Sequence, residues 1–288
     1  MQIISGLSDI IERYDAVFCD LWGAVHDGLA PYPGVPECLQ TLRERDVPLV
    51  LISNAPRPNP HVRRHLAGMG VEESLYTHVI TSGDATVRAI NTGSDALHAG
   101  LDARFFHIGP DRSASLVNAV EGESVDFETA GYLLNSGLVD DERDSVADYD
   151  AMLRQALARG LPMICANPDY EVMRGDIVVP CAGALALAYE EMGGRVAWHG
   201  KPHTDVFHLA SEAVGNPDRS RILMIGDTHR TDIAGANAYG IDSLWLGGGL
   251  HAERLALQPG GRLDEEVARA ICAAEPAKPT FAGAYLTW

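Results

Sequence analysis

The sequence predicts an α/β protein whose core is a doubly wound parallel sheet, and three observations lead to this prediction. Short apolar runs of strand length alternate with runs of helical patterning from residue 16 to residue 246. Glycine or proline stands at the ends of most of these runs. Acidic or small polar residues follow several apolar runs, and open parallel sheets bind ligands at these carboxyl ends of their strands.

The first series of expected elements ends at residue 99. The run AVFCDL is apolar almost throughout, which predicts a buried strand. Pro36 suits the first turn of the helix that follows, and Gly70 suits the position just after the end of the next helix. The expected strands are Ala16–Leu21, Pro48–Ser53 and His78–Ser82, and the expected helices are Pro36–Arg45, Asn59–Met69 and Asp84–Ala99.

A second series of elements begins at residue 104. The pair Gly109-Pro110 ends its first strand, Gly160 stops its first helix, and Gly193-Gly194 stops an alanine-rich helix. The expected strands are Arg104–Ile108, Ala130–Leu134, Pro162–Ala166, Arg195–His199, Arg221–Ile225 and Ser243–Leu246. The expected helices are Tyr149–Arg159, Ala182–Met192, Thr231–Tyr239, Ala252–Gln258 and Asp264–Ala274.

Composition limits the classes of partner. The chain has 288 residues, of which 40 are acidic and 22 are basic, so its formal charge is −18. An acidic surface of this size repels nucleic acid and anionic lipid, so neither is expected as a main partner. Binding of a small anionic ligand is not excluded, because one pocket can be positive while the protein as a whole is negative.

Other features of the sequence predict a cytoplasmic protein. No apolar run reaches the ~18 residues that a membrane helix needs, and the N-terminus lacks the basic start and cleavage site of a secretory signal. The 5 cysteines are scattered and form no C-x-x-C pair, which favours reduced thiols over a disulfide framework.

Two segments place polar residues directly after expected strands in the first series. Asp20 ends the first strand, where a carboxylate can be a nucleophile, a metal ligand or a cap on a neighbouring loop. Ser53 and Asn54 end the second strand. A hydroxyl and the backbone N–H groups of such a turn can hold a phosphate oxygen, and a simple turn is the alternative.

Two later segments add a cation and a pair of acids. Lys201 stands between Gly200 and Pro202 just before a helix, where it can neutralise a phosphate or simply lie in solvent. Asp227 and Asp232 flank a strand-to-helix loop and can both reach one cation. Mg²⁺ prefers such carboxylate ligands together with substrate phosphate, whereas Asp232 alone also suits the start of a helix.

The order of these four segments resembles the haloacid dehalogenase-like phosphohydrolases. The details GKPH, GDTHRTDIAGANAYG and the NPD of Asn167–Asp169 are similar to the class IIA branch, which includes nucleotide and sugar phosphatases. The resemblance covers about residues 14–249 and implies a core domain formed by residues 1–84 and 180–288. It also implies an α/β cap domain inserted at residues 85–179, which would close over the site, whereas the tail 250–288 carries no matching motif.

The resemblance further implies a Mg²⁺-dependent phosphohydrolase acting on a small phosphorylated metabolite such as a sugar phosphate. Asp20 would be the nucleophile that accepts the phosphoryl group as an aspartyl phosphate. Relatives of this branch can dimerise through the cap, which implies a homodimer. The implied metal ligands are Asp20, the Trp22 carbonyl, Asp227 and Asp232, the implied phosphate-binding residues are Ser53, Asn54 and Lys201, and the implied cap residues are Asn167, Asp169 and Gly183.

The first motif departs from the family pattern D-x-D, because Trp22 replaces the second aspartate, which is the family's general acid and base. An indole cannot transfer a proton at neutral pH. General acid–base catalysis contributes about 10²–10⁴-fold in rate, or roughly 3–5 kcal/mol of barrier. His26 and Asp27 are the nearest candidate replacements, and the alternatives are a loop histidine and a turn residue without catalytic roles.

Two alternative functions follow from this departure. One is a degenerate, non-catalytic protein that binds a phosphorylated metabolite or a protein partner. The other is phosphoryl transfer from a donor with a good leaving group, such as an acyl phosphate, which needs less help from an acid. In the cap, an Asx-type turn is the alternative for Asp169, and tight helix packing is the alternative for Gly183.

Overall fold

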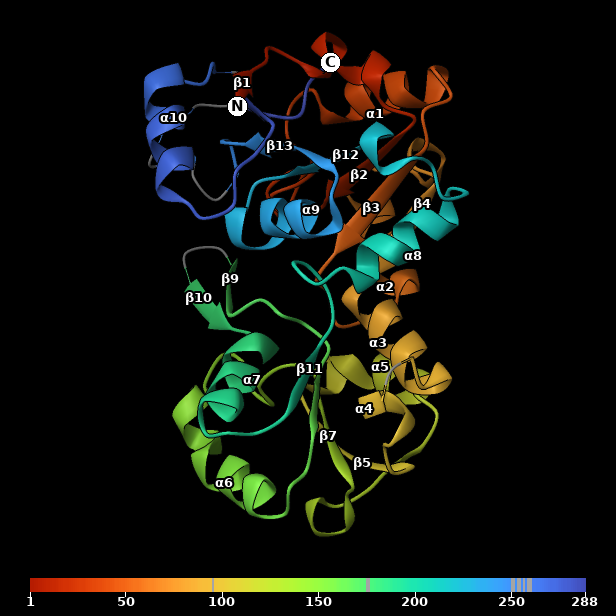
Figure 1. Ribbon diagram of the computed structural model, residues 1–288, viewed down its shortest axis with the longest axis vertical. Coiled ribbons are helices and arrows are strands. Elements are labelled where there is room, and N and C mark those ends of the chain that lie inside the picture. The colour runs from red at the N-terminus through yellow and green to blue at the C-terminus, as the bar shows by residue number, and fades with distance from the viewer. Residues whose placement is uncertain (95, 175–176, 250–251, 253–254, 256, 258–260) are drawn as a thin grey trace. The chain divides into compact units, whose positions relative to one another are not determined.

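The structure is a computed structural model that describes residues 1–94, 96–174, 177–249, 252, 255, 257 and 261–288. Contacts between residues divide the chain into two compact units. The first unit comprises Met1–Ser53, Pro60–Ile80 and Lys201–Trp288, and the second comprises Asn54–Asn59 and Thr81–Gly200. In Figure 1 the first unit therefore holds the red and blue ends of the colour scale, and the second holds most of the yellow and green segments.

The first unit is built on a parallel sheet, as the sequence predicts. The strand β2 lies at its centre and is buried along its whole length, which explains its uninterrupted apolar sequence. Every pair in this sheet with a described register is parallel. The strand order is β1 (Gln2–Ile3), β14 (Phe281–Gly283), β13 (Asp242–Leu246), β12 (Ile222–Gly226), β2 (Ala16–Asp20), β3 (Leu49–Ser53) and β4 (His78–Thr81).

Helices surround this sheet. The helix α10 packs Ala268 and Ile271 against Trp245 of β13 and Ala282 of β14. The α-helices of this unit are α1 (Val35–Glu44), α2 (Asn59–Gly68), α8 (Asp205–Ala213), α9 (Ala234–Tyr239) and α10 (Glu265–Ala274). Single-turn elements are the 3₁₀ helices η1 (Leu7–Asp9), η2 (Ile11–Arg13), η3 (Glu73–Leu75) and η7 (Arg219–Arg221), and the π-helical turn η8 (His229–Ile233).

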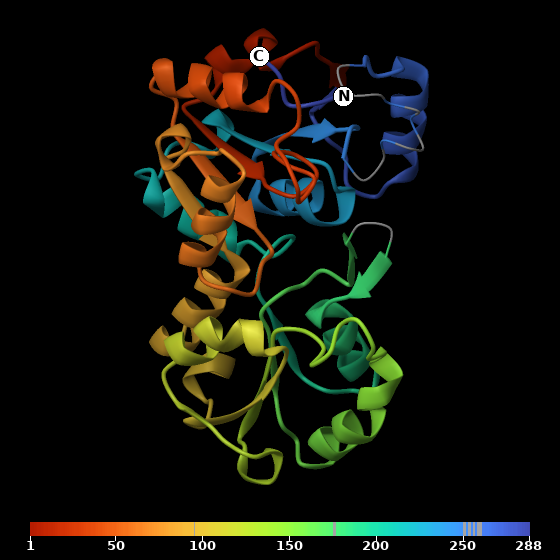
Figure 2. The same cartoon turned by 180° about the vertical axis from the view of Figure 1, so that it is seen from behind.

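The second unit has its own parallel sheet with a separate core on each face. Leu133 of β7 packs with helices α6 and α7, and its neighbour Leu134 packs with α5 on the opposite face. Figure 2 shows this unit from behind, with helices on both sides of its strands. The strand order is β11 (Val196–Trp198), β8 (Met163–Cys165), β7 (Tyr132–Asn135), β5 (Arg104–Ile108) and β6 (Glu123–Ser124).

The remaining elements of the second unit connect and cover these strands. An antiparallel hairpin, β9 (Glu171–Arg174) with β10 (Ile177–Pro180), stands apart from the five-stranded sheet. The α-helices are α3 (Ser82–Thr92), α4 (Ala96–Ala99), α5 (Ala114–Ala119), α6 (Asp150–Ala158) and α7 (Ala182–Glu191). The 3₁₀ helices are η4 (Asp111–Ser113), η5 (Phe127–Thr129) and η6 (Val146–Tyr149).

Several element boundaries differ from the sequence-based expectation. The helix expected at Asp84–Ala99 is two helices, because Gly93 adopts a left-handed conformation with φ of 58° and ends α3. The expected helix Thr231–Tyr239 begins earlier, as a π-helical turn at His229. The tail contributes strand β14, which the sequence does not predict. The helix expected at Ala252–Gln258 lies largely outside the described residues.

The second unit is longer than the insertion that the sequence predicts at residues 85–179. Helix α3 belongs to it because Val87 and Ile90 pack against the core of its sheet. Strand β11 belongs to it because Val196 pairs with Met163 of β8. The assignment of the two units as a catalytic core and a cap stays a prediction. Within the described residues, none of the helices has both the length and the apolar character that crossing a membrane requires.

We expect the start of α3 to depend on Thr81. The Thr81 Oγ1 atom accepts a hydrogen bond from the Asp84 N–H at 2.9 Å, and the Asp84 carboxylate accepts one from the Thr81 N–H at 2.9 Å. Thr81→Val keeps the side-chain shape and removes this cap, so it should lower the free energy of unfolding by about 1 kcal/mol. Urea unfolding measures the loss. The control is Thr92→Val at the exposed end of the same helix, and an equal loss in both variants would contradict the prediction.

Candidate active site

Three adjacent strands of the first unit end at the candidate site. Strand β2 pairs with β12 on one side and with β3 on the other. Asp20 is the last residue of β2, Ser53 is the last residue of β3, and Asp227 directly follows β12. Parallel strands bring their carboxyl ends to one edge of a sheet, which is where such folds bind ligands.

A cluster of three buried carboxylates lies at this edge. Asp20, Asp227 and Asp232 each offer an oxygen, and these oxygens lie within 4.8 Å of one another. Burial and the charges of Asp232 and Asp227 raise the pKa of Asp20 well above its usual value, although Lys201 opposes this shift. Converging carboxylate oxygens are donors that suit a hard divalent cation. The residues present therefore fit a metal ion such as Mg²⁺.

Lys201 supplies a buried cation beside these acids. Its side chain is only 2% exposed. The Nζ atom contacts the Asp20 carboxylate, lies 2.8 Å from Asp232 Oδ1, and donates to the carbonyl of Ile52 at 3.1 Å. The contacts with Asp20 and Ile52 are hydrogen bonds, and the contact with Asp232 is an ion pair. Burial by itself lowers the pKa of Lys201, but the Asp20 and Asp232 charges outweigh burial and raise it, so the ammonium stays charged.

Two glycines make room for the carboxylates. A Cβ atom on Gly23, whose φ is 88°, would lie 2.1 Å from Asp227 Oδ2. A Cβ atom on Gly226 would lie 2.3 Å from the Asp232 carboxyl carbon. Any side chain at these positions would therefore displace a carboxylate of the cluster.

Thr228 holds two of the acids, and the sequence analysis missed it. Its hydroxyl donates to Asp227 Oδ1 at 3.0 Å, and its backbone N–H donates to Asp232 Oδ2 at 3.1 Å. The indole N–H of Trp245 donates to the Asp227 carbonyl at 2.8 Å. The position of Thr228 directly after Asp227 was a usable signal, whereas Trp245 is distant in sequence and gave none.

The loop after β2 holds Trp22 and His26 against each other. Their ring centroids lie 5.7 Å apart, and the His26 ring also contacts the His65 ring. The Nδ1 atom of His26 accepts a hydrogen bond from the Gly28 N–H at 3.0 Å. Burial and the charge of His65 lower the pKa of His26 to about 4, so the imidazole is neutral at pH 7. This geometry suits a structural loop histidine, and the predicted catalytic role of His26 stays a prediction.

Asp27 has the contacts of a turn residue. Its Oδ1 atom accepts hydrogen bonds from the N–H groups of Leu29 and Ala30, each at 2.8 Å. These bonds lower the pKa of the Asp27 carboxyl, because they favour its charged form. The turn alternative therefore explains Asp27 without a proton-transfer role.

The predicted cap residues come together in the second unit. Asn54 Nδ2 donates to Asp169 Oδ1 at 3.0 Å. The Asn167 side chain accepts from the Asp169 N–H at 3.0 Å, which is an Asx turn. The Gly183 N–H donates to the Asp169 carbonyl at 3.1 Å, and a Cβ atom on Gly183 would lie 2.5 Å from that oxygen. The predicted site residues thus form two groups, and Ser53, half-buried at the end of β3, belongs to the first unit.

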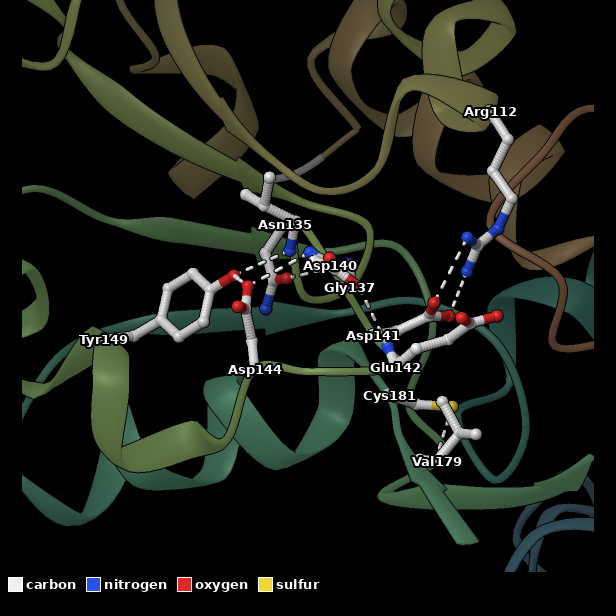
Figure 3. Close-up of polar contacts among 11 residues, drawn as sticks. Arg112, Asn135, Gly137, Asp140, Asp141, Glu142, Asp144, Tyr149, Val179 and Cys181 are labelled. Atoms are coloured by element: carbon white, nitrogen blue, oxygen red, sulfur yellow. Dashed lines mark hydrogen bonds and ion pairs between the residues drawn. The ribbon is translucent and has the colours of Figure 1, made fainter. Parts of the chain in front are cut away.

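A further polar cluster of the second unit, which the sequence analysis missed, orders the loop after β7 (Figure 3). Asn135 donates to the Ala182 carbonyl at 2.9 Å and accepts from the Gly137 N–H at 3.2 Å. The Tyr149 hydroxyl donates to Asp144 at 2.6 Å. The bond between Asn135 and Ala182 joins segments 47 residues apart, so no local pattern could have indicated it, whereas the other two contacts are local.

We expect the buried ammonium of Lys201 to be essential for stability. Lys201→Met leaves buried carboxylates without their cation, so it should lower the free energy of unfolding by about 3–5 kcal/mol in metal-free buffer. The control, Arg269→Met, removes an exposed ion pair to Glu265 and should cost less than about 1 kcal/mol. Urea unfolding measures both losses. The double variant Asp20→Asn/Lys201→Met should recover part of the loss, and no recovery would contradict this account.

The burial of His26 predicts a pH dependence of stability. Because the folded state lowers its pKa from 6.5 to about 4, the unfolded state binds more protons in this interval. Stability from His26 is therefore complete above pH 6.5 and is lost as the pH falls towards 4, by roughly 3 kcal/mol. His26→Asn keeps an acceptor for the Gly28 N–H and does not titrate. The unfolding free energy of the wild type should fall relative to that of the variant as the pH is lowered from 6.5 to 4. A difference that stays constant with pH would refute the prediction.

Comparisons with known proteins agree with this site. A model of the haloacid dehalogenase-like hydrolase family matches residues 17–123, and a related model matches residues 198–274. A crystal structure of a haloacid dehalogenase-like hydrolase from Brucella suis is 38% identical, with a TM-score of 0.82, over 97% of this chain and 98% of that one.

Relatives of named activity are phosphatases. The D-glycerol 3-phosphate phosphatase of Mycobacterium tuberculosis is 29% identical over 83% of this chain, and the match spans 65% of that relative's length. The ribonucleotide monophosphatase NagD of Escherichia coli is 27% identical over 79% of this chain and 85% of its own. A structure of the M. tuberculosis enzyme with magnesium has a TM-score of 0.72 at 25% identity, over 96% of this chain and 77% of that one. Our chain therefore belongs to the haloacid dehalogenase-like hydrolase family, in its class IIA branch.

Proposed function

We propose that this protein is a Mg²⁺-dependent phosphoric monoester hydrolase that acts on a small phosphorylated metabolite. The observation that carries the proposal is the buried group in which Lys201 contacts both Asp20 and Asp232 while Asp227 lies beside them. The phosphatase activity of the named relatives supports the reaction class. A sugar phosphate or a similar metabolite is the proposed substrate.

Asp20 is the proposed nucleophile. One of its carboxylate oxygens attacks phosphorus, and the bond between phosphorus and the ester oxygen breaks, which gives an aspartyl phosphate. Water then attacks this phosphorus, the bond to the Asp20 oxygen breaks, and inorganic phosphate leaves with the carboxylate regenerated. Splitting the reaction in this way needs a carboxylate that is ionised and held in one orientation. The contact with the Lys201 ammonium orients the carboxylate and favours its ionised form, whereas burial and the neighbouring acids oppose ionisation, which a bound cation would offset.

Charge neutralisation is the second requirement. Phosphoryl transfer depends mostly on positioning and on electrostatic stabilisation of the phosphoryl oxygens. Lys201, the Ser53 hydroxyl and the Asn54 backbone are the proposed phosphate-binding groups. Asp20, Asp227 and the Trp22 carbonyl are the proposed ligands of Mg²⁺, with Asp232 as a further ligand or a support. Mg²⁺ bound there would offset the negative charge that otherwise repels an anionic nucleophile.

Trp22 distinguishes this chain from relatives with an acid at that position. The proposed hydrolysis consequently has weakened or altered activity towards plain alkyl phosphates. The same residue favours a second candidate, a non-catalytic protein that binds a phosphorylated metabolite. The buried contact between Lys201 and Asp20 argues for catalysis, because a binding protein has no chemical need for a buried carboxylate held against a cation.

The cellular location and the oligomeric state of the protein are also proposals. All five cysteines are buried thiols, which supports a cytoplasmic location. The homodimer that the family resemblance implies stays a prediction.

We expect Asp20→Asn to abolish phosphate release from a panel of sugar, nucleotide and aryl phosphates with Mg²⁺. The loss in kcat should be at least ~10³-fold, because the amide cannot form the covalent intermediate. The control is Asp15→Asn, an exposed aspartate just before β2 that pairs with Arg221. A phosphate-release assay with and without a chelator measures activity and metal dependence. If wild type and Asp20→Asn are equally inert and neither binds beryllium fluoride with Mg²⁺, the non-catalytic candidate is correct.

A further inference from the structure

Trp22 is a large aromatic side chain left exposed beside the carboxylate cluster. It is 45% exposed, although it lies only two residues after the buried Asp20. The next residue, Gly23, touches the Asp227 carboxylate, because a Cβ atom there would lie 2.1 Å from Oδ2. Trp22 is therefore attached to the chain between Asp20 of the cluster and a glycine that lies against Asp227.

The Trp22 indole is held in place by contacts with its own loop. A Cβ atom on Gly28, whose φ is 95°, would lie 2.4 Å from the Cη2 atom of Trp22. The buried His26 ring packs edge-on against the indole at an interplanar angle of 73°. The Gly23 N–H donates to the His26 carbonyl at 2.9 Å, which closes the loop around these contacts. A rigid, exposed aromatic surface loses little entropy on binding, which makes it suited to hold a planar ligand.

Neither of the two predicted replacements for the missing acid, His26 and Asp27, is placed to donate a proton. His26 is only 3% exposed, and its Nδ1 atom is occupied by the Gly28 N–H. The Asp27 carboxylate accepts two backbone hydrogen bonds within its own turn. An ester oxygen that departs next to Trp22 therefore receives no proton from either of these two residues. A phenolic oxygen, with a pKa of about 10, leaves in this way far more readily than an alkyl oxygen, which is a much stronger base.

We propose that Trp22 is a specificity residue whose indole stacks against an aromatic leaving group, and that the substrates are aryl phosphate monoesters. The proposal rests on the proposed function and names its substrate class. As the Asp20 oxygen bonds to phosphorus, the bond between phosphorus and the phenolic oxygen breaks. The electron pair stays on that oxygen, the aromatic ring delocalises the charge of the phenolate, and water later supplies its proton.

Matched esters separate stacking from leaving-group acidity. Benzyl phosphate and cyclohexylmethyl phosphate both release a primary alcohol and differ in ring planarity. The wild-type kcat/KM should favour the benzyl ester by about 2- to 12-fold, as expected for an aromatic pair. Trp22→Leu should bring this ratio close to one, and Trp22→Phe should restore most of it. A loop that is merely distorted lowers both esters equally and leaves the ratio unchanged, which would overturn the proposal.

Leaving-group acidity is tested in the wild-type enzyme alone. The series 4-nitrophenyl, phenyl and benzyl phosphate should show a steep fall in kcat/KM as the leaving oxygen becomes more basic. Trp22→Asp installs a carboxyl at the position of the missing acid and should flatten that dependence. Equal turnover of phenyl and benzyl phosphate by the wild type would contradict an aryl substrate.

A binding measurement keeps this inference distinguishable from the proposed function. Phenylphosphonate and cyclohexylphosphonate cannot be hydrolysed, and their Kd values can be measured by calorimetry with Mg²⁺ present. Wild type and Trp22→Phe should prefer phenylphosphonate, and Trp22→Leu should not. An enzyme that turns over esters without a Trp22-dependent aromatic preference refutes only the inference. A protein with this preference but no turnover refutes the proposed hydrolysis and the substrate class that rests on it, and leaves only the stacking role of Trp22.

Discussion

The contact of the Lys201 ammonium with Asp20 and Asp232 is the interaction on which the rest of the site depends. Removing two carboxylates from water is unfavourable by several kcal/mol for each ion, and only a cation with well-directed contacts offsets it. Lys201 meets this condition because its third contact is the carbonyl of Ile52, at the end of β3. One side chain therefore joins the ends of two neighbouring strands to the helical turn that carries Asp232. The order of the strands in the sheet therefore determines which polar groups meet at its edge.

Close packing of backbone around the acids follows from this constraint. The backbone at Gly23 and Gly226 packs so closely against the carboxylates of Asp227 and Asp232 that neither position has room for a side chain. This close packing helps to keep the carboxylates buried. Thr228 then supplies the hydrogen bonds that water would otherwise make to Asp227 and Asp232. The contacts with Lys201 and Thr228 explain how the three acids can lie close together without a bound metal ion. They leave the cluster short of positive charge, and a divalent cation would supply it.

The strands and the acid cluster were predictable from the sequence because their causes are local. The strand β2 is a continuous apolar run, and an acid at the end of a buried parallel strand has few places to point except the ligand edge. The break of the helix at Gly93 and the early start of η8 at His229 depend on backbone conformation, which the apolar pattern does not report. Strand β14 has only three residues and is fixed by its neighbours β1 and β13. The burial of His26 was equally hidden, since it depends on packing against His65 across the unit.

Trp22 and Lys201 together favour changed chemistry over lost chemistry. A protein that had lost catalysis would gain stability by replacing its buried ions with apolar side chains, because buried ion pairs are often no better than hydrophobic packing. This chain instead keeps Asp20, Asp227 and Asp232 buried around Lys201. His26 and a left-handed glycine, Gly28, also pack against the Trp22 indole, which stands where the family pattern D-x-D has its second aspartate. The buried ion cluster is unfavourable for stability, and an aromatic ring is held in place beside it. This combination suits a reaction whose leaving group needs a stacking surface more than it needs a proton donor.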